Sequence, residues 1–395
     1  MFAAAKVELF FNPASIFFNF FSQKNIILSY IPNNQRFNNF PNNSTIQQLN
    51  TSTIQQNPYL CILKNKSLMT QKNILGIGNA LVDMLTQIPD DNILNQLNLP
   101  KGSMQHVDAE TSLKTGDYLK QYGNSMAAGG STANTMSGAA KLGVKTGYIG
   151  KVGNDDLGRF FANEMTKTNV RPLMLNTDTP TGCAIAIISK DGERTFATYL
   201  GAALELSADD IRQEMFDGWD LLYLEGYLVL NQALVNKSLQ LAKAKGMTIA
   251  IDLASYNIVE ANRDYLNDIV KNYIDIVFAN EEEAKAFSGL EDPEAALHYL
   301  ASMCDIAIVK VGAKGSYAQH GDQVVKIDPI PAKVVDTTGA GDLWAAGFLS
   351  GYVNNEPLEK CVKRGATVAA NIIEVLGAKM DDERWEKIHN SLKEL

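Results

Sequence analysis

The sequence has few of the residues from which metal clusters and disulfide frameworks are built. Its four cysteines and four histidines are scattered, and no two cysteines form a CxxC pair. A structural zinc site or a disulfide framework needs ligands clustered at short spacing, so we expect neither. Isolated cysteines are typical of a reducing compartment, and we therefore expect the protein in the cytoplasm.

Positive charge is also scarce. The chain has 35 Lys and Arg against 44 Asp and Glu, a formal net charge of −9. Proteins that bind nucleic acids usually present a basic surface to the phosphates, so this balance argues against a nucleic-acid partner. Beyond residue 70 there is no uncharged apolar run of about 18 residues, so we expect no membrane-spanning helix there. A nucleotide is not excluded, because its phosphates need only local N–H donors and a cation.

Residues 1–70 lack the apolar periodicity of folded elements. They are rich in Phe and Asn and then in Asn, Gln, Ser and Thr, and Glu8 is their only acidic residue. Such sequence buries too little apolar surface to offset the entropy cost of ordering, so we expect it to be disordered and outside the fold. Three interpretations compete: a targeting peptide, a functional tail, or a native start at Met69 that makes the extension non-native. We favour the third.

From residue 73 onward, short apolar runs alternate with helical patterns such as 233–246 and 281–289. The runs are rich in Ile and Val and cover 73–80, 145–153, 183–189, 220–227, 247–254, 274–280 and 305–312. Runs of this kind are typical of buried strands in a mostly parallel sheet. Their alternation with helices predicts a doubly wound α/β fold, with a mostly parallel sheet flanked by helices.

Two stretches, 84–125 and 178–201, interrupt this alternation with β-type and turn sequence. In the second stretch, Asp191-Gly192 is a good hairpin turn. We expect these stretches to form a small β lid on the main sheet, able to close over a substrate.

The segment 336–342, DTTGAGD, carries the clearest chemistry. Its glycines let a phosphate approach the backbone, and a helical pattern follows, so we expect an anion site at a helix N-terminus. The donors of this site would be the N–H groups of Gly339, Ala340, Gly341 and Asp342. The Asp342 carboxylate would take the proton of an acceptor hydroxyl while the donors hold the migrating phosphoryl group. The structural alternative is a glycine turn followed by an aspartate helix cap.

No Walker loop and no protein-kinase HRD or DFG motif occurs, so two other kinase classes are excluded. DTTGAGD and the Ala/Gly-rich helix after it resemble the C-terminal signature of the PfkB/ribokinase family of carbohydrate and nucleoside kinases. Residues 127–161, AAGGSTANTMSGAAKLGVKTGYIGKVGNDDLGRFF, resemble the other signature of that family. The resemblance covers about 73–390. It implies a ribokinase-like kinase domain over 71–395, ATP and Mg²⁺ as cofactors, and also a potassium ion near 336–338.

The resemblance implies that Gly129, Gly130 and Asn134 hold the acceptor hydroxyls. Asp83 follows the first strand, at the edge where open α/β sheets bind ligands, and a carboxylate there accepts two hydrogen bonds from a ribose diol. Arg194, in the lid hairpin, would bring positive charge to the phosphates on closure. The structural alternatives are glycines needed only for packing, an acidic helix cap, and a solvated surface arginine.

Asn280 and Glu283 match the N-x-x-E motif that the family uses to position magnesium and phosphate, often through water. Acidic residues in the first turn of a helix need no metal, and we assign Glu281 and Glu282 to that structural class. The motif therefore implies a water-mediated magnesium contact from one amide and one carboxylate.

Lys310, Gly312 and Gly315 stand where the family cradles the nucleotide. The match is incomplete, because a small hydroxyl residue is common at the position of Lys310. Asn371, in a later helix, is a candidate for the adenine pocket, with a packing role as the equal alternative.

Five segments resemble the adenosine kinase version of the family motifs: GNALVD, AGGSTAN, PTGCAIAI, NEEEAKAF and DTTGAGD. We therefore expect adenosine as the phosphoryl acceptor and ATP as the donor. A sugar kinase for ribose, fructose or a related sugar is one alternative. A non-catalytic nucleoside-binding protein is another, and the intact base argues against it. The expected partners are thus a nucleoside or sugar and ATP. An exposed sheet edge is compatible with a homodimer, and a monomer equally fits.

Overall fold

The computed structural model describes residues 6–11, 14–20, 26–30 and 72–395, and the chain divides into a unit 1–70 and a unit 71–395. In the first unit, β1 (Lys6–Phe11), β2 (Ala14–Phe20) and β3 (Ile26–Tyr30) form an antiparallel sheet. The rest of the extension for which we expect disorder lies outside the described residues. Its exclusion from the main fold stays a prediction.

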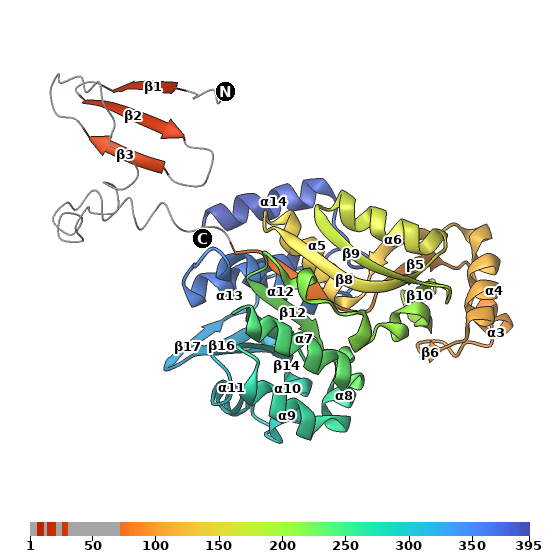
Figure 1. The fold of residues 1–395 in the computed structure, drawn as a ribbon. Coiled ribbons are helices and arrows are strands. Elements are labelled where there is room, and N and C mark those ends of the chain that lie inside the picture. Colours follow the sequence, from red (N-terminus) through yellow and green to blue (C-terminus); the bar gives the residue numbers. More distant parts are fainter. Residues whose placement is uncertain (1–5, 12–13, 21–25, 31–71) are drawn as a thin grey trace. The chain divides into compact units, whose positions relative to one another are not determined.

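The second unit is built on a nine-stranded sheet (Figure 1). Its strands are β4 (Ile74–Ile77), β8 (Thr146–Gly153), β9 (Val170–Thr177), β12 (Leu221–Glu225), β13 (Thr248–Asp252), β14 (Ile276–Asn280), β15 (Ile306–Lys310), β16 (Ser316–His320) and β17 (Gln323–Ile327). They lie in the order β17-β16-β15-β14-β13-β12-β4-β8-β9, and only the two pairs that involve β16 are antiparallel. The predicted mostly parallel sheet is confirmed.

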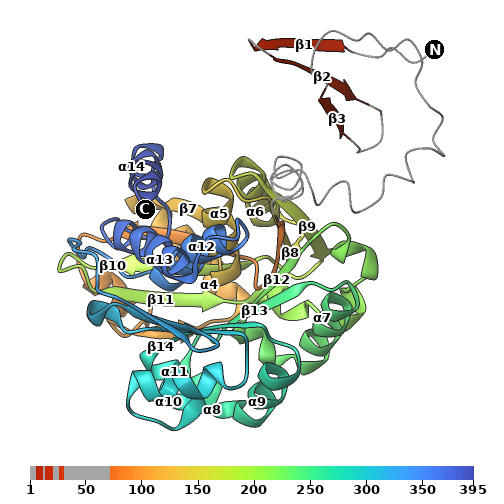
Figure 2. The same ribbon diagram turned by 90° about the vertical axis from the view of Figure 1, so that its left-hand side faces the viewer.

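Helices cover both faces of this sheet (Figures 1 and 2). One layer holds α5 (Ser131–Lys141), α6 (Asp156–Lys167), α12 (Ala340–Tyr352), α13 (Leu358–Ile372) and α14 (Asp382–Lys393). The other holds α7 (Gln232–Ala244), α8 (Tyr256–Ala261), α9 (Arg263–Asn272), α10 (Glu281–Ser288) and α11 (Pro293–Ala301). Alternate strand residues enter the two cores, with Tyr223 in the first and Leu222 and Leu224 in the second. Among the described residues, no helix combines the length and apolar character that crossing a membrane requires.

A second, smaller sheet draws strands from both stretches predicted for the lid, 84–125 and 178–201, and two of its strands extend beyond the first stretch. Its strands are β5 (Leu81–Gln87), β6 (Met104–His106), β7 (Ser125–Gly129), β10 (Gly182–Ile188) and β11 (Arg194–Tyr199), in the order β6-β11-β10-β5-β7. The turn between β10 and β11 contains Asp191-Gly192, and Gly192 has a φ of +87°, as the hairpin prediction requires.

Two expectations for this region were wrong. The run 183–189 forms β10 of the small sheet and not a strand of the main sheet, because an apolar run does not specify which sheet it joins. Residues 84–125 also hold two helices, α3 (Asn92–Gln96) and α4 (Ala109–Leu119). The Asp108 carboxylate caps α4 by accepting the Thr111 N–H at 2.8 Å, and this start signal was overlooked.

Short 3₁₀ turns complete the chain: η2 (Lys120–Tyr122), η3 (Gly201–Glu205), η4 (Ala208–Asp210), η5 (Gln213–Phe216), η6 (Gly226–Leu230) and η7 (Gly312–Lys314).

The packing that positions α12 depends on small residues. A Cβ atom added at Gly347 of α12 would lie 2.6 Å from the Arg364 carbonyl oxygen of α13. The glycine therefore lets the two helices approach closely, and this fixes where the N-terminus of α12 points.

We predict that Gly347→Ala destabilises the protein by about 1–3 kcal/mol, because the added methyl group collides with backbone that cannot yield easily. The gain in helix propensity, roughly 1 kcal/mol, does not offset this. The matched control is Gly116→Ala in α4, where the nearest atom, Ile185 Cδ1, lies 3.8 Å from the added Cβ atom. We expect it to stabilise by about 0.5–1 kcal/mol. Urea denaturation measures both, and equal effects would contradict the packing argument.

Candidate active site

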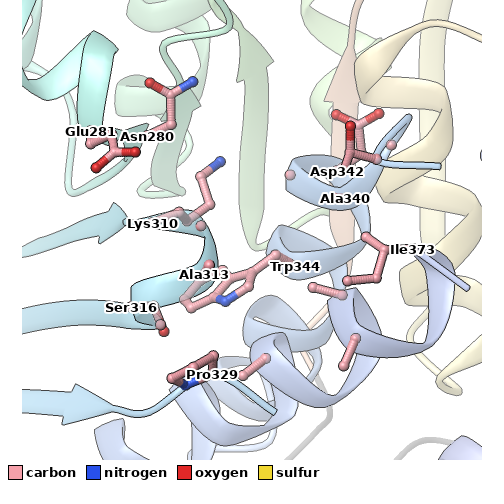
Figure 3. Close-up of a pocket in the computed structure, with 18 of the residues that line it drawn as sticks. Asn280, Glu281, Lys310, Ala313, Ser316, Pro329, Ala340, Asp342, Trp344 and Ile373 are labelled. Carbon is pink, nitrogen blue, oxygen red and sulfur yellow. The ribbon is translucent and has the colours of Figure 1, made fainter. Parts of the chain in front are cut away.

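A cavity of about 920 Å³ lies at the carboxyl ends of the parallel strands, which is where open α/β sheets bind ligands. Asp252, Asn280 and Lys310 are the last residues of β13, β14 and β15, and all three line the cavity. Figure 3 shows Asn280 and Lys310 on one side of the cavity and Ala340 and Asp342, at the start of α12, on the other. Residues from distant parts of the sequence therefore meet at one sheet edge.

The start of α12 presents backbone N–H groups in an arrangement that suits an anion. Gly339 precedes the helix with a φ of +74°, and a Cβ atom there would lie 2.7 Å from Ala378 Cβ. The N–H groups of Gly341 and Asp342 have no acceptor within residues 72–395. The expected set of four free donors was too large, because the Ala340 N–H donates to the Thr337 carbonyl at 3.1 Å.

The Asp342 carboxylate is held by two donors from α5. Ser131 Oγ donates to Asp342 Oδ1 at 2.8 Å, and Asn134 Nδ2 donates to Asp342 Oδ2 at 3.0 Å. Burial raises the pKa of Asp342, while these two hydrogen bonds and the charge of Lys310 oppose the rise. The carboxylate is thus oriented and more basic than an ordinary aspartate.

Lys310 supplies a buried cation beside this site. Its Nζ atom lies 2.9 Å from Asp252 Oδ2, with side-chain exposures of 14% and 7%, and a Cβ atom added at Gly341 would lie 3.2 Å from it. Burial alone lowers the pKa of Lys310, but the charges of Asp252 and Glu283 outweigh it, and the net shift is upward. Lys310 is therefore charged and next to the helix N-terminus. Asp252 was missed from sequence, although it ends an apolar run as the other edge residues do.

Asn280 and Glu283 cap α10 reciprocally. Glu283 Oε2 accepts the Asn280 N–H at 2.8 Å and Glu283 Oε1 accepts Asn280 Nδ2 at 2.7 Å, while Asn280 Oδ1 accepts the Glu283 N–H at 2.8 Å. Burial, with the charge of Asp252, raises the pKa of Glu283 to about 7. Glu281 and Glu282, assigned to a structural class, also line the cavity.

These contacts limit how a magnesium ion fits. Both Glu283 oxygens are engaged by Asn280, and within the described residues no three His, Cys, Asp or Glu side chains gather as a metal-binding group. Magnesium retains several waters and binds phosphate oxygens readily. The residues therefore fit an ion held by phosphates and water, with Asn280 and Glu283 in its outer shell.

Asp83 and the paired glycines lie together, and none of them lines the cavity. Asp83 is on β5, and its carboxylate occupies the space that a Cβ atom at Gly129 would need. Gly130 has a φ of +92°, and a Cβ atom there would collide with the Asn79 carbonyl. The glycines are thus required by packing, and this packing brings Asp83 to the site. Burial raises the pKa of Asp83 to about 6, against the opposing charge of Lys379.

Two further charged residues were missed from sequence. Lys379 Nζ donates to Asn134 Oδ1 at 3.2 Å, and no motif marks this lysine. Glu225 ends β12 and accepts the N–H groups of Asn79 and Thr132 at 3.0 and 3.2 Å. Burial raises the pKa of Glu225. A charged residue near the end of the apolar run 220–227 was the available signal for it.

Arg194 reaches from β11 to the loop before α12. It forms an ion pair with Asp336 and donates to Thr338 Oγ1 at 2.6 Å. Burial raises the pKa of Asp336, but the Thr338 and Gly377 N–H groups and the Arg194 charge lower it further, to a value below the usual range. Both contacts of the Arg194 guanidinium are therefore with the glycine-rich loop before α12, residues 336–339, called the glycine loop below. A potassium ion at 336–338 would have to share this carboxylate with a guanidinium, so these residues do not fit the implied ion.

The other expected nucleotide residues divide into two groups. Gly312 and Gly315 line the cavity, and Gly315 has a φ of +96°. Asn371 is not among the lining residues; its Nδ2 atom donates to the Thr367 carbonyl within α13 at 2.9 Å. The face of α13 that reaches the cavity is apolar instead, and it lines the cavity together with the loop 328–334 and Trp344. In Figure 3, Pro329 of this loop lies farther from Asp342 than Trp344 and Ile373 do.

Comparison with known proteins agrees with this geometry. The family model described as "pfkB family carbohydrate kinase" matches residues 102–384. The chain is similar to the crystal structure of adenosine kinase from Sinorhizobium meliloti, with 32% identity and a TM-score of 0.72, over 82% of this chain and 100% of that one. A probable sugar kinase from Rhizobium etli CFN 42 gives the same identity and TM-score, over 82% of this chain and 99% of that one.

An uncharacterized sugar kinase of Archaeoglobus fulgidus is 30% identical, over 61% of this chain and 96% of its own length. The family implies ATP and usually Mg²⁺, and its members in these comparisons are named as sugar and nucleoside kinases. The chain belongs to the PfkB family of carbohydrate kinases and is a sugar or nucleoside kinase.

Proposed function

We propose that the protein phosphorylates adenosine, with ATP as donor and AMP and ADP as products. The observation that carries the reaction is the position of Asp342, a hydrogen-bonded carboxylate at free helix N–H donors and next to the buried Lys310 cation. Adenosine as the acceptor is supported by the family motifs around Asp83 and by the similarity to an adenosine kinase at 32% identity.

The lining of the cavity supports a position for the phosphates and another for the adenine of ATP. The γ-phosphoryl group lies at the Gly341 and Asp342 N–H groups, where the helix dipole and the Lys310 charge attract it. The adenine lies at the apolar end, against α13 and the loop 328–334. Asn280 and Glu283 would hold a magnesium ion through water, and the ion when bound would neutralise phosphate charge.

Asp342 acts as the base. Ser131 and Asn134 aim its oxygens, and burial makes it a better proton acceptor than an exposed aspartate. As the acceptor hydroxyl attacks, its proton passes to Asp342 while the helix donors hold the transferring group. Asp83, ionised, accepts hydrogen bonds from the ribose diol and fixes the hydroxymethyl group near the base.

An acceptor panel tests the proposal. The purified protein is assayed with ATP and adenosine, other nucleosides, ribose and fructose, with ADP formation as the readout. We expect the highest kcat/KM for adenosine. Faster turnover of ribose or fructose would reject the nucleoside and retain the kinase.

We predict that Asp342→Asn lowers kcat at least about 100-fold, the usual scale for losing an acid–base group. Binding of ATP, measured by calorimetry with a non-hydrolysable analogue, should change little, because the helix donors and Lys310 remain. The control is Asp382→Asn at the start of α14, since the Asp382 side chain is 93% exposed and its one ion pair within residues 72–395 is with Lys141 of α5. Near-normal turnover by the Asp342→Asn enzyme would show that the base is misassigned.

We predict an acid limb in kcat/KM for the acceptor near pH 6. Burial raises the pKa of Asp83 to about 6, so its hydrogen-bond-accepting carboxylate is lost as pH falls through that value, well above the range of an ordinary aspartate. Asp83→Asn should raise the acceptor KM about 10-fold or more and remove this limb. A limb that persists unchanged in the variant would assign it to another group.

A further inference from the structure

Lys379 enters the site from the connection between α13 and α14. This connection is tied to the glycine loop, because the Gly377 N–H donates to Asp336 Oδ2 at 2.5 Å. The same Asp336 carboxylate pairs with Arg194 of the small sheet. The backbone that carries Lys379 is therefore anchored to the loop that begins α12.

A chain of two hydrogen bonds joins Lys379 to the base. Lys379 Nζ lies 3.2 Å from Asn134 Oδ1, and Asn134 Nδ2 lies 3.0 Å from Asp342 Oδ2. An ammonium group only donates and an ionised carboxylate only accepts. The amide between them can therefore satisfy both neighbours in one orientation only, with its oxygen toward Lys379 and its nitrogen toward Asp342.

The charge of Lys379 has no close counter-ion. Within residues 72–395 it forms no ion pair at 4.0 Å or less, although it faces the carboxylates of Asp83, Asp342 and Glu164 at longer range. Burial lowers the pKa of Lys379, and these carboxylates oppose the effect. The Lys379 side chain is only partly exposed, and a largely desolvated charge without an adjacent partner does not stabilise a fold, so stability does not explain this lysine.

We propose that Lys379 is a positioning residue for the phosphoryl-transfer reaction: it locks the Asn134 amide so that Asn134 Nδ2 points at Asp342 and holds the base toward the acceptor hydroxyl. The inference rests on the proposed function in that Asp342 is the base. It does not depend on which acceptor is phosphorylated. Asn134 accordingly serves the base, in addition to any contact with acceptor hydroxyls.

The groups around Asp342 determine how its pKa changes when Lys379 is replaced. The polar and charged groups that face it come from several elements: Ser131 and Asn134 of α5, Asp83 of β5, Asp252 of β13, Lys310 of β15, Tyr223 of β12, Tyr227 of η6, and Lys379. Lys310 remains when Lys379 is replaced. Loss of Lys379 removes one of two cations and frees the amide, and both changes raise the pKa of Asp342.

The test uses Lys379→Met, Lys379→Arg, Asn134→Ala and the double variant Lys379→Met/Asn134→Ala, assayed with the acceptor that the wild-type protein turns over fastest. We predict that Lys379→Met lowers kcat about 10–100-fold, the scale of a misplaced catalytic group, and moves the acid limb of kcat to higher pH. Lys379→Arg, which keeps the charge and the donors, should restore most of kcat and the limb. The double variant should be no slower than the slower single variant, because both substitutions interrupt the same series of hydrogen bonds from Lys379 through Asn134 to Asp342.

The matched control is Lys245→Met, since Lys245 pairs with Asp217 at the surface, away from the cavity. It should leave kcat and the pH profile unchanged. An unshifted acid limb, multiplicative losses in the double variant, or a failure of arginine to rescue would each overturn the positioning role. If ribose or fructose replaces adenosine as the best acceptor, the proposed function fails while the same variants still decide the role of Lys379.

A second measurement needs no acceptor. The urea midpoints of the wild-type protein, Lys379→Met, Asp342→Asn and their double variant form a double-mutant cycle, which measures the coupling of the two residues in the folded protein. Non-additive midpoints support the link between the two residues, and additive midpoints reject it.

Discussion

In the proposed reaction, the Asp342 carboxylate has to remain available as a base although the surrounding protein largely removes it from water. Burial favours its protonated form, and only a few groups oppose this: the Ser131 hydroxyl, the Asn134 amide and the cations nearby. Two of these donors lie on α5, while Asp342 is on α12, so the site exists only as long as the two helices keep their register. A Cβ atom at Gly138 of α5 would lie 2.7 Å from Leu343 Cδ1 of α12, which shows how closely they pack.

The requirement that a buried charge has a hydrogen-bond or ion-pair partner also applies to the other carboxylates of the site. Asp252, Glu283 and Glu225 are buried at the ends of adjacent elements, and none of them is left without a donor: Lys310 pairs with the first, Asn280 caps the second, and backbone N–H groups bind the third. Lys310 is held between these carboxylates and the helix N-terminus. ATP therefore meets a cation that is already in place, which reduces the reorganisation that phosphoryl transfer requires.

The sequence predicted the parts of this arrangement that depend on local pattern. The Ile/Val runs gave the strands. The spacing of Asn280 and Glu283 was interpreted as a magnesium motif, and their reciprocal capping of α10 came only from the structure. The run 183–189 fits both the main sheet and the lid stretch 178–201, and only the structure decides that it forms β10 of the small sheet. Periodicity also does not show that the Asn371 amide donates within its own helix. Asp252 and Glu225 were within reach, because a charged residue that ends an apolar run at a sheet edge is itself a signal.

The sequence alone determined the doubly wound fold and the glycine-rich start of α12, and it singled out Asp342 as the base of the proposed reaction. These follow from spacing within short segments and from the resemblance those segments carry. The tertiary structure alone decided the partners of each charge: Lys379 with Asn134, Lys310 with Asp252, and Arg194 with Asp336, pairs separated by 245, 58 and 142 residues. A hydrogen bond or ion pair depends on distance in space, and only the packing of the two helix layers on the sheet brings such distant residues together.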